Sequence, residues 1–369
     1  MIYLDNGATS FHKPPAVRRA VVDAMGSCAN PGRGGYPAAI TAARKIYGCR
    51  EQAAELFDCS PEQVVLTTSC THGLNIAIRS LVKPGARVVV SGFEHNAVTR
   101  PLHALGARIT VAGRKLFDWG DTLFRFEEAL KKGQDAAVFT HVSNVFGYIL
   151  PVEQMAALCR RYGVPFVLDA AQSAGTLPVS LKALGADFIA MPGHKGLLGP
   201  QGTGLLLCAG DAEPLLQGGT GSESAIQQMP EYLPDRLEPG TLNVPGFAGL
   251  REGLRYLNRV GVDTVRRREH REGERCISGL KNLGMQVFHG PHQGGTVSFL
   301  PGMDCEEAAQ ILALQGIAVR AGLHCAPYAH ESAGTLASGT VRVSFGYDCT
   351  AAQTEAFLRA ASKLPPFLQ

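Results

Sequence analysis

Two neighbouring strand-like segments of the sequence end in polar residues that could do cofactor chemistry. The apolar run PFVL ends at Asp169, with Gln172 three residues later, and the run DFIAM is followed closely by His194 and Lys195. Open α/β sheets bind ligands at the carboxyl ends of their strands. A carboxylate and an amine at that edge match pyridoxal 5'-phosphate (PLP), whose ring nitrogen takes an anionic partner and whose aldehyde binds a lysine. A capping aspartate and a solvated lysine are the ordinary alternative for each residue alone, but the combination favours a PLP site.

Three more strand-like segments also end in polar residues. Thr71 and His72 follow VVLTT at the start of a helix, where free backbone N–H groups could bind a phosphate. His95 follows RVVVS and could stack on an aromatic ring, and Asn144 follows AAVFTHV. Neither GxxxxGK[ST] nor GxGxxG occurs, which argues against a nucleotide. A plain helix cap or a buried histidine would explain each site singly, so the signal is their convergence on one edge.

A second cluster lies near the C-terminus and contains Arg320, His324, Cys325 and Arg342. A cysteine beside a histidine and near arginines can have a lowered pKa and react as a thiolate. Arg342 lies in the strand-like TVRVSF and could grip a carboxylate with two hydrogen bonds. A buried cysteine and a surface arginine are the structural alternatives. A metal site is not expected, because one cysteine with scattered histidines lacks ligand spacing.

Composition sets the broad class of the chain. Its 369 residues include 45% hydrophobic and 18% charged residues, with a net charge of +3. Such a chain is long enough for two domains, and its small net charge gives no reason to expect nucleic acid or a membrane surface as a partner. The ten cysteines form no CxxC pair, so most should be reduced and buried. We expect the cytoplasm as the location and no membrane span.

The pattern of apolar segments predicts an α/β fold. From Val64 onward, short apolar runs alternate with helical stretches, which is typical of a mostly parallel sheet covered by helices. The run GLLLC (204–208) should be one more strand, interpreted as an antiparallel edge. We expect an N-terminal arm at residues 1–12, a large domain at 13–245 and a smaller α+β domain at 246–369. The helices expected between the early strands are Leu74–Leu81, Ala97–Leu105, Arg125–Lys132 and Val152–Tyr162.

Nine segments together resemble one family, the class V PLP enzymes of aminotransferase fold type I. These segments are YLDNGATS, SCTHGLN, EHNAV, THVSNVFG, LDAAQSAG, GHKGLLGPQGTG, RLEPGTLN, RAGLHCAP and TVRVSFG, and they span nearly the whole chain. The similarity is strongest to the branch of cysteine desulfurases and selenocysteine lyases, specifically the SufS-like second group. The resemblance implies a seven-stranded, mostly parallel sheet in the large domain and a homodimer.

The resemblance assigns cofactor roles to the residues at the strand ends. Lys195 would bind the PLP aldehyde covalently, and Asp169 would pair with the ring nitrogen. Gln172 would bond the ring oxygen, His95 would stack on the ring, and Asn144 would lie nearby.

The phosphate group would take a further set of residues. Thr71 and His194 would hold it, with His72 beside them, and Thr241 would reach the phosphate bound in the partner subunit. Two departures from the family pattern stand here: Pro192 replaces a Ser or Thr, and His72 replaces a Glu.

The resemblance also implies a reaction and its catalytic residues. Arg342, with Arg320 and Asn144, would bind the substrate, and Cys325 would accept sulfur from L-cysteine as a persulfide while alanine leaves. Lys195, Cys325 and His95 would be catalytic. L-Selenocysteine is an alternative substrate, and a separate acceptor protein would take the sulfur or selenium. Another class V reaction (transamination, epimerisation or cysteine lysis) or a non-catalytic PLP-bound regulator are the alternatives.

Overall fold

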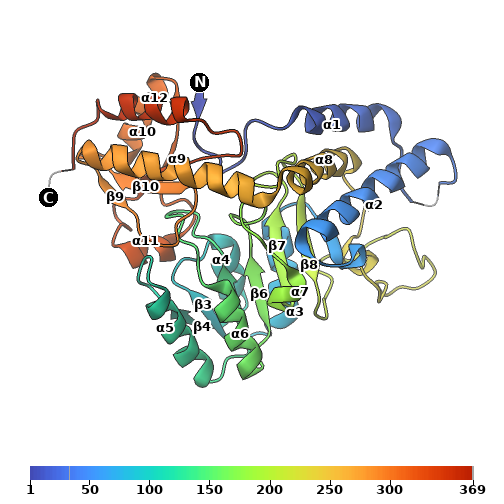
Figure 1. Ribbon diagram of the computed structural model, residues 1–369. Helices are drawn as coiled ribbons and strands as arrows, with labels where there is room; N and C mark the ends of the chain where they lie inside the picture. The colour runs from blue at the N-terminus through green and yellow to red at the C-terminus, as the bar shows by residue number, and fades with distance from the viewer. Residues whose placement is uncertain (33, 368–369) are drawn as a thin grey trace.

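The computed structural model describes residues 1–32 and 34–367 and contains a seven-stranded mixed sheet at its centre (Figure 1). Residues 33, 368 and 369, which belong to the expected large and small domains, lie outside the described residues. Six of the strands run parallel and β8 runs antiparallel to both of its neighbours. The strand order across the sheet is β2 (Val64–Thr67), β8 (Gly204–Cys208), β7 (Phe188–Pro192), β6 (Phe166–Asp169), β5 (Ala136–Thr140), β3 (Arg87–Ser91) and β4 (Arg108–Ala112).

Helices cover both faces of this sheet because alternate strand residues point to opposite sides. Val89 belongs to a buried cluster that includes α2, α5, α6 and α8, whereas Val88 and Val90 belong to a second cluster with α3 and α4. The helices of this part are α1 (Pro15–Ser27), α2 (Pro37–Phe57), α3 (Cys70–Leu81), α4 (Asn96–Ala104), α5 (Trp119–Lys131), α6 (Val152–Tyr162), α7 (Leu181–Leu184) and α8 (Val244–Val260), with short 3-10 turns η1 (Pro61–Gln63) and η2 (Asp235–Leu237).

A smaller antiparallel sheet forms the C-terminal part together with three helices. Its strand order is β12 (Arg320–Gly322), β13 (Thr340–Ser344), β10 (Thr296–Leu300) and β9 (Gln286–Phe288). Helices α9 (Val262–Asn282), α10 (Cys305–Leu314) and α12 (Ala351–Ala361) pack on it in a third buried cluster, and α11 (Pro327–Ala333) follows β12. The N-terminal arm joins this part, since β1 (Ile2–Tyr3) pairs with β11 (Ile317–Ala318) and Leu4 enters the same cluster.

The α/β class with a mostly parallel seven-stranded sheet is confirmed, with one correction. We expected the GLLLC strand at an edge, but β8 lies between β2 and β7 and all five of its residues are buried. An unbroken apolar strand is typical of a sheet interior, and β2 takes the edge instead. The division into domains after residue 245 stays a prediction; in the structure α8 packs against α1 and α2. No described helix is long and apolar enough to cross a bilayer.

A buried ion pair ties α2 to the segment before α8, and its loss gives a test of the fold. Arg50 donates to both carboxylate oxygens of Glu238 at 2.8 and 2.5 Å, and the Leu66 N–H of β2 donates to the same carboxylate at 2.6 Å. Glu238→Gln should lower the free energy of unfolding by roughly 3–5 kcal/mol, because it leaves the buried guanidinium without a counter-charge. Equilibrium unfolding in urea measures this change in the free energy of unfolding.

The matched control is Asp263→Asn, which removes one partner of an exposed pair with Arg266 and should change the unfolding midpoint far less. Equal effects of the two substitutions would contradict the assignment of Glu238 as a structural anchor.

Candidate active site

Asp169 and Lys195 meet at the carboxyl ends of β6 and β7, as expected from their positions in the sequence. Asp169 is 2% exposed; its Oδ1 accepts from the Ala171 N–H at 2.9 Å and from the Cys70 thiol at 3.6 Å. No described residue bonds its Oδ2. Burial raises the pKa of Asp169 and lowers the pKa of Lys195, while the charges of the two groups act in the opposite sense. The pair is therefore a desolvated acid and a desolvated amine close together.

His95 caps α4 beside this pair, and the cap fixes its ring. Nδ1 accepts a hydrogen bond from the Ala97 N–H at 3.0 Å, so the proton of the neutral ring is on Nε2. Burial, helped by the charges of Lys195 and Arg342, lowers the pKa of His95 to about 4. A neutral, fixed imidazole can stack on a ring or donate from Nε2, but it does not carry a positive charge at neutral pH.

The start of α3 supplies the anion-binding features that the sequence indicated. Ser69 is the N-cap and accepts from the His72 N–H at 3.1 Å, while Thr71 is exposed in the first turn. The first N–H groups of a helix have no intrahelical acceptor and attract anions. Burial lowers the pKa of His72, whose Nδ1 lies 3.4 Å from Thr68 Oγ1. This end of α3 could hold a phosphate group.

The N-terminal arm fixes the turn that carries His194 and Lys195. The His194 carbonyl oxygen accepts from the Ser10 N–H at 3.0 Å and from Lys13 Nζ at 3.0 Å, and Thr9 Oγ1 lies 3.0 Å from His194 Nδ1. Burial lowers the pKa of His194 to about 4. The arm thereby holds the lysine backbone in place from a distant part of the sequence.

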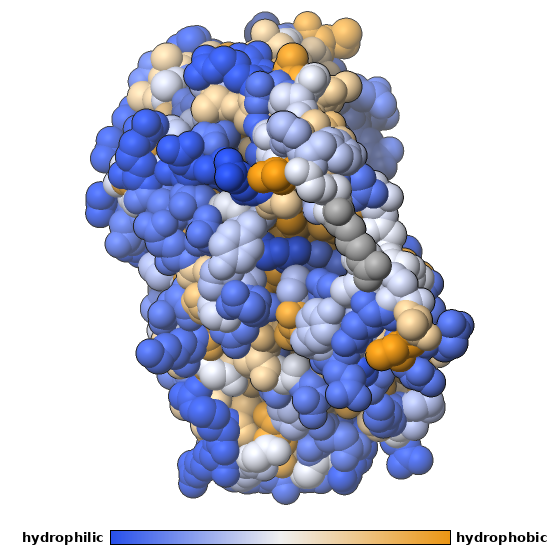
Figure 2. Space-filling model, turned by 90° about the vertical axis from the view of Figure 1, so that its right-hand side faces the viewer, coloured by the Kyte–Doolittle hydropathy of each residue, from blue (hydrophilic) through white to orange (hydrophobic). Residues whose placement is uncertain are grey.

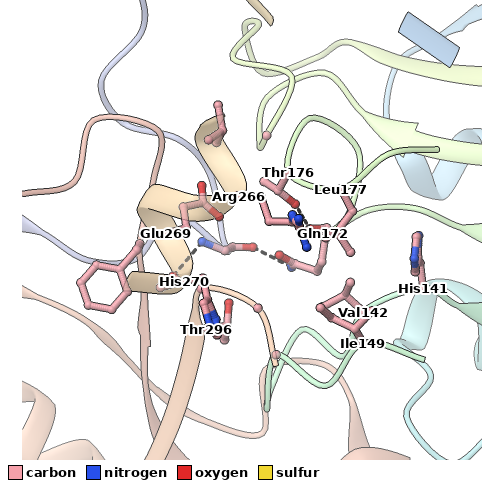
Figure 3. Close-up of a pocket in the computed structure, with 18 of the residues that line it drawn as sticks. His141, Val142, Ile149, Gln172, Thr176, Leu177, Arg266, Glu269, His270 and Thr296 are labelled. Atoms are coloured by element: carbon pink, nitrogen blue, oxygen red, sulfur yellow. Dashed lines mark hydrogen bonds between the residues drawn. The ribbon is translucent and has the colours of Figure 1, made fainter. Parts of the chain in front are cut away.

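Gln172 lies between the arm and a cavity of about 530 Å³. Its Nε2 donates to the Gly7 carbonyl at 3.0 Å, which leaves the second amide hydrogen for another acceptor. The cavity continues from Lys195 and Gln172 toward α9, from which Glu269 and His270 extend on the opposite wall (Figure 3). Burial raises the pKa of Glu269 to about 8. The volume of this cavity lies within the usual range for small-molecule pockets.

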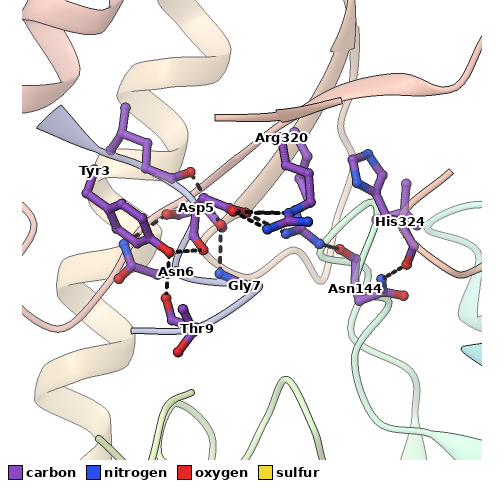
Figure 4. A network of polar contacts seen from close by, with 12 residues as sticks. Tyr3, Asp5, Asn6, Gly7, Thr9, Asn144, Arg320 and His324 are labelled. Carbon is purple, nitrogen blue, oxygen red and sulfur yellow. Dashed lines mark hydrogen bonds and ion pairs between the residues drawn. The ribbon is translucent and has the colours of Figure 1, made fainter. Parts of the chain in front are cut away.

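Asp5 connects the arm to Arg320 (Figure 4) and also to Arg342, the two arginines predicted to bind substrate. Its Oδ1 accepts from Arg342 Nη2 at 2.8 Å, and its Oδ2 accepts from Arg320 Nη2 at 2.8 Å and Arg320 Nε at 3.0 Å. Arg342 Nη1 donates to the Asn144 carbonyl at 2.9 Å, and Arg342 Nε is buried without a partner. Arg342 is 2% exposed, so its guanidinium is buried and fixed by Asp5 and the Asn144 carbonyl, with Nε left for a further acceptor.

Cys325 is the exposed member of the ten free cysteines and lies in a strained turn. His324 and Cys325 have φ values of 49° and 56°, in the left-handed region that non-glycine residues rarely occupy. The turn is held from two sides: Asn144 Nδ2 donates to the His324 carbonyl at 2.8 Å, and the Asn96 N–H donates to the Cys325 carbonyl at 2.7 Å. Asn144 therefore links the Cys325 turn directly to Arg342.

Sequence reasoning missed three contributors to this region: Asp5, Cys70 and Glu94. Glu94 is fully buried, accepts from the Thr140 N–H at 3.0 Å, and has a pKa raised to about 8 by burial. The position of Glu94 directly before His95 was a usable signal, whereas nothing local marked the other two.

Thr241 is exposed, and no hydrogen bond among the described residues joins it to the Lys195 region. No three His, Cys, Asp or Glu side chains in the described ranges are placed to hold a metal ion.

Comparisons with known proteins agree with this geometry. The model of the family described as aminotransferase class-V matches residues 2–357. A "Probable cysteine desulfurase" of Methanothermobacter thermautotrophicus is 34% identical, covering 94% of this chain and 90% of that protein. A protein of Pyrococcus abyssi with the same name is 31% identical, covering 99% of this chain and 94% of that protein.

Solved structures give the same relationship. The structure of a cysteine desulfurase from Thermococcus onnurineus has a TM-score of 0.90 and 33% identity, covering 98% of this chain and 94% of that chain. The Escherichia coli cysteine desulfurase CsdA has a TM-score of 0.85 and 25% identity, covering 98% and 94%. The chain belongs to the class V aminotransferase family.

Proposed function

We propose that this protein is a PLP-dependent cysteine desulfurase that converts L-cysteine to L-alanine and leaves the sulfur on Cys325. The observation that carries the proposal is the Asn144 link, which joins the exposed Cys325 turn to the buried guanidinium of Arg342. The group proposed to bind the substrate carboxylate and the exposed thiol are thus joined through one residue. The many relatives named cysteine desulfurases support the same reaction.

The residues of the site fit PLP chemically. The free Oδ2 of Asp169 suits a protonated ring nitrogen, the Lys195 amine suits the aldehyde, and the α3 N-terminus at Thr71 suits the phosphate. His95 would cover one face of the ring and Gln172 would bond its oxygen. When bound, PLP supplies an electron sink for the carbanion that forms at the substrate Cα.

The mechanism then follows from the side chains. Arg342 binds the substrate carboxylate, and the desolvated Lys195 amine removes the proton from Cα, because its lowered pKa leaves it neutral more often. The Cys325 thiolate attacks the substrate sulfur, so the substrate C–S bond breaks and an S–S bond forms. Proton return to the substrate carbon gives alanine. The balance is one cysteine and one thiol converted to one alanine and one persulfide.

An alternative substrate and three alternative reactions have to be considered beside cysteine desulfuration. L-Selenocysteine could enter by the same route, since it carries the same carboxylate and amine and its selenium departs more easily. Transamination, epimerisation and elimination share the early proton transfer but do not need a thiol, so the exposed, positioned Cys325 favours desulfuration. Product identity separates them: alanine alone for desulfuration, pyruvate for elimination, and a keto-acid requirement for transamination.

The first prediction concerns the cofactor. Purified protein should contain PLP, and borohydride reduction should fix the pyridoxyl group on Lys195, measured by peptide mass spectrometry. Lys195→Ala should abolish turnover, because both the attachment and the proton acceptor are lost, and should still bind PLP non-covalently through Asp169 and Thr71. Lys182→Ala, at an exposed lysine of α7, is the control and should leave the label on Lys195. Label on another lysine would contradict the assignment.

The second prediction separates chemistry from binding at Cys325. Cys325→Ala should lose alanine formation from L-cysteine by a factor on the order of 100 or more, because the sulfur acceptor is gone, while PLP content stays unchanged. The variant should retain more of any selenocysteine activity. Cys28→Ala, at a half-buried cysteine, is the control and should behave as wild type. If Cys325→Ala forms alanine from L-cysteine at the wild-type rate, the persulfide mechanism is contradicted.

The third prediction concerns a homodimer, supported by apolar side chains that α1, α2 and the residue before α2 leave exposed. Val22, Met25, Tyr36, Ile40 and Tyr47 are 40–72% exposed there. Figure 2 shows the side of the molecule that lies on the right in Figure 1, with separate hydrophobic residues around a hollow. In the proposed dimer Thr241 of each subunit reaches the phosphate bound in the other.

Sedimentation should therefore show a dimer for the wild type, a monomer with poor PLP retention for Ile40→Glu, and a dimer for the control Leu314→Glu on α10. Full activity of a monomer would contradict a shared site. The acceptor protein that takes the sulfur is a further expected partner.

A further inference from the structure

Asp5 lies between two arginines that would otherwise repel each other. Arg320 on β12 and Arg342 on β13 are directly opposite in the antiparallel register. Like charges in that arrangement are unfavourable, more so when one of them is buried. Asp5, 7% exposed, accepts from both guanidinium groups at 2.8 Å and so supplies the counter-charge.

The backbone of the arm fixes where this counter-charge sits. The Leu4 N–H donates to the Ala318 carbonyl at 2.9 Å, and the Ser344 N–H donates to the Leu4 carbonyl at 2.7 Å. The Gly7 N–H donates to Ser344 Oγ at 2.7 Å. Asp5 is therefore held on both sides by bonds from its neighbours to β11 and β13, and its carboxylate does not need to move for the arginines to be paired.

The cluster keeps one net positive charge. Two guanidinium groups and one carboxylate give +1, and no other acid among the described residues forms an ion pair with either arginine. One substrate carboxylate neutralises that charge. A ligand with a second anionic group would find Arg320 already neutralised by Asp5.

Arg320 extends the cluster toward the reactive thiol. Its side chain is 51% exposed, unlike the buried Arg342. The hydrogen bonds from Asp5 raise the pKa of Arg320 most, and the charge of Cys325 adds to the same effect. Strand β12, which carries Arg320, ends at Gly322, three residues before Cys325, so the charge of Arg320 lies near the thiol that would receive the sulfur of a bound amino acid.

We propose that Asp5 sets the charge selectivity of the substrate site, favouring amino acids with one carboxylate and a neutral side chain over those that carry a second anionic group. The natural substrate rests on the proposed function, whereas the charge of the cluster follows from Asp5, Arg320 and Arg342 themselves. Asp5 acts as a positioning residue here, through the two arginines.

The test uses the holoenzyme and two probes that lack sulfur, L-alanine and L-aspartate, with dissociation constants measured by calorimetry. Asp5→Asn raises the cluster to +2, so the ratio of the aspartate to the alanine dissociation constant should fall roughly tenfold. Arg320→Gln lowers the cluster to zero, so the same ratio should rise. The double variant restores +1 and should return the ratio to within about twofold of wild type. Asp5→Glu keeps the charge and should keep the wild-type ratio.

A purely structural role for Asp5 makes a different prediction, because loss of packing would weaken both probes equally and the double variant would bind worst of all. That pattern, or a shift of the ratio in the same direction for Asp5→Asn and Arg320→Gln, would overturn the proposal. If Asp5→Asn does not fold, Arg320→Gln and the double variant decide, because the ratio must rise in the first and return in the second. Absence of alanine formation from cysteine by the wild type would end the desulfurase proposal while leaving the selectivity pattern to be judged separately.

Discussion

The site depends on the desolvation of an acid and an amine that the fold brings together without pairing them fully. Asp169 ends β6 and Lys195 follows the end of the adjacent parallel strand β7 by three residues, and the carboxyl ends of such strands lie at one edge of the sheet. Burial shifts both pKa values toward the neutral forms. A buried acid with a free oxygen is costly for the protein alone, and a cationic ring nitrogen would relieve that cost.

The site also requires distant parts of the chain to pack against the carboxyl-end edge of the sheet. The arm fixes the His194 carbonyl on one side and places Asp5 between the arginines on the other. Asn144, from the segment after β5, bonds both Arg342 and the turn that carries Cys325. The arm and the segment after β5 therefore fix the Arg342 guanidinium relative to the thiol, and the strained left-handed turn at Cys325 is held in place by its surroundings.

Local patterns explain which features the sequence could predict. The strands and the residues at their ends were predictable because an apolar run followed by a polar group is a short-range signal, as at Asp169 and His95. Strand pairing is not a local property. The interior position of β8 depends on β2 taking the edge of the sheet, which composition does not encode. Helix α5 starts at Trp119 rather than Arg125, since Asp118 caps it. Asp5 was missed because its partner Arg342 lies 337 residues away in the sequence.

The most direct test of the central claim is a single turnover of the wild-type holoenzyme with limiting L-cysteine labelled at sulfur and no reductant. Alanine and protein-bound label are quantified together, and the label is located by peptide mapping. Equal amounts of alanine and of labelled sulfur on Cys325 are expected, each matching the cysteine supplied. Pyruvate as the product, a requirement for a keto acid, or alanine formed without label on Cys325 would contradict it.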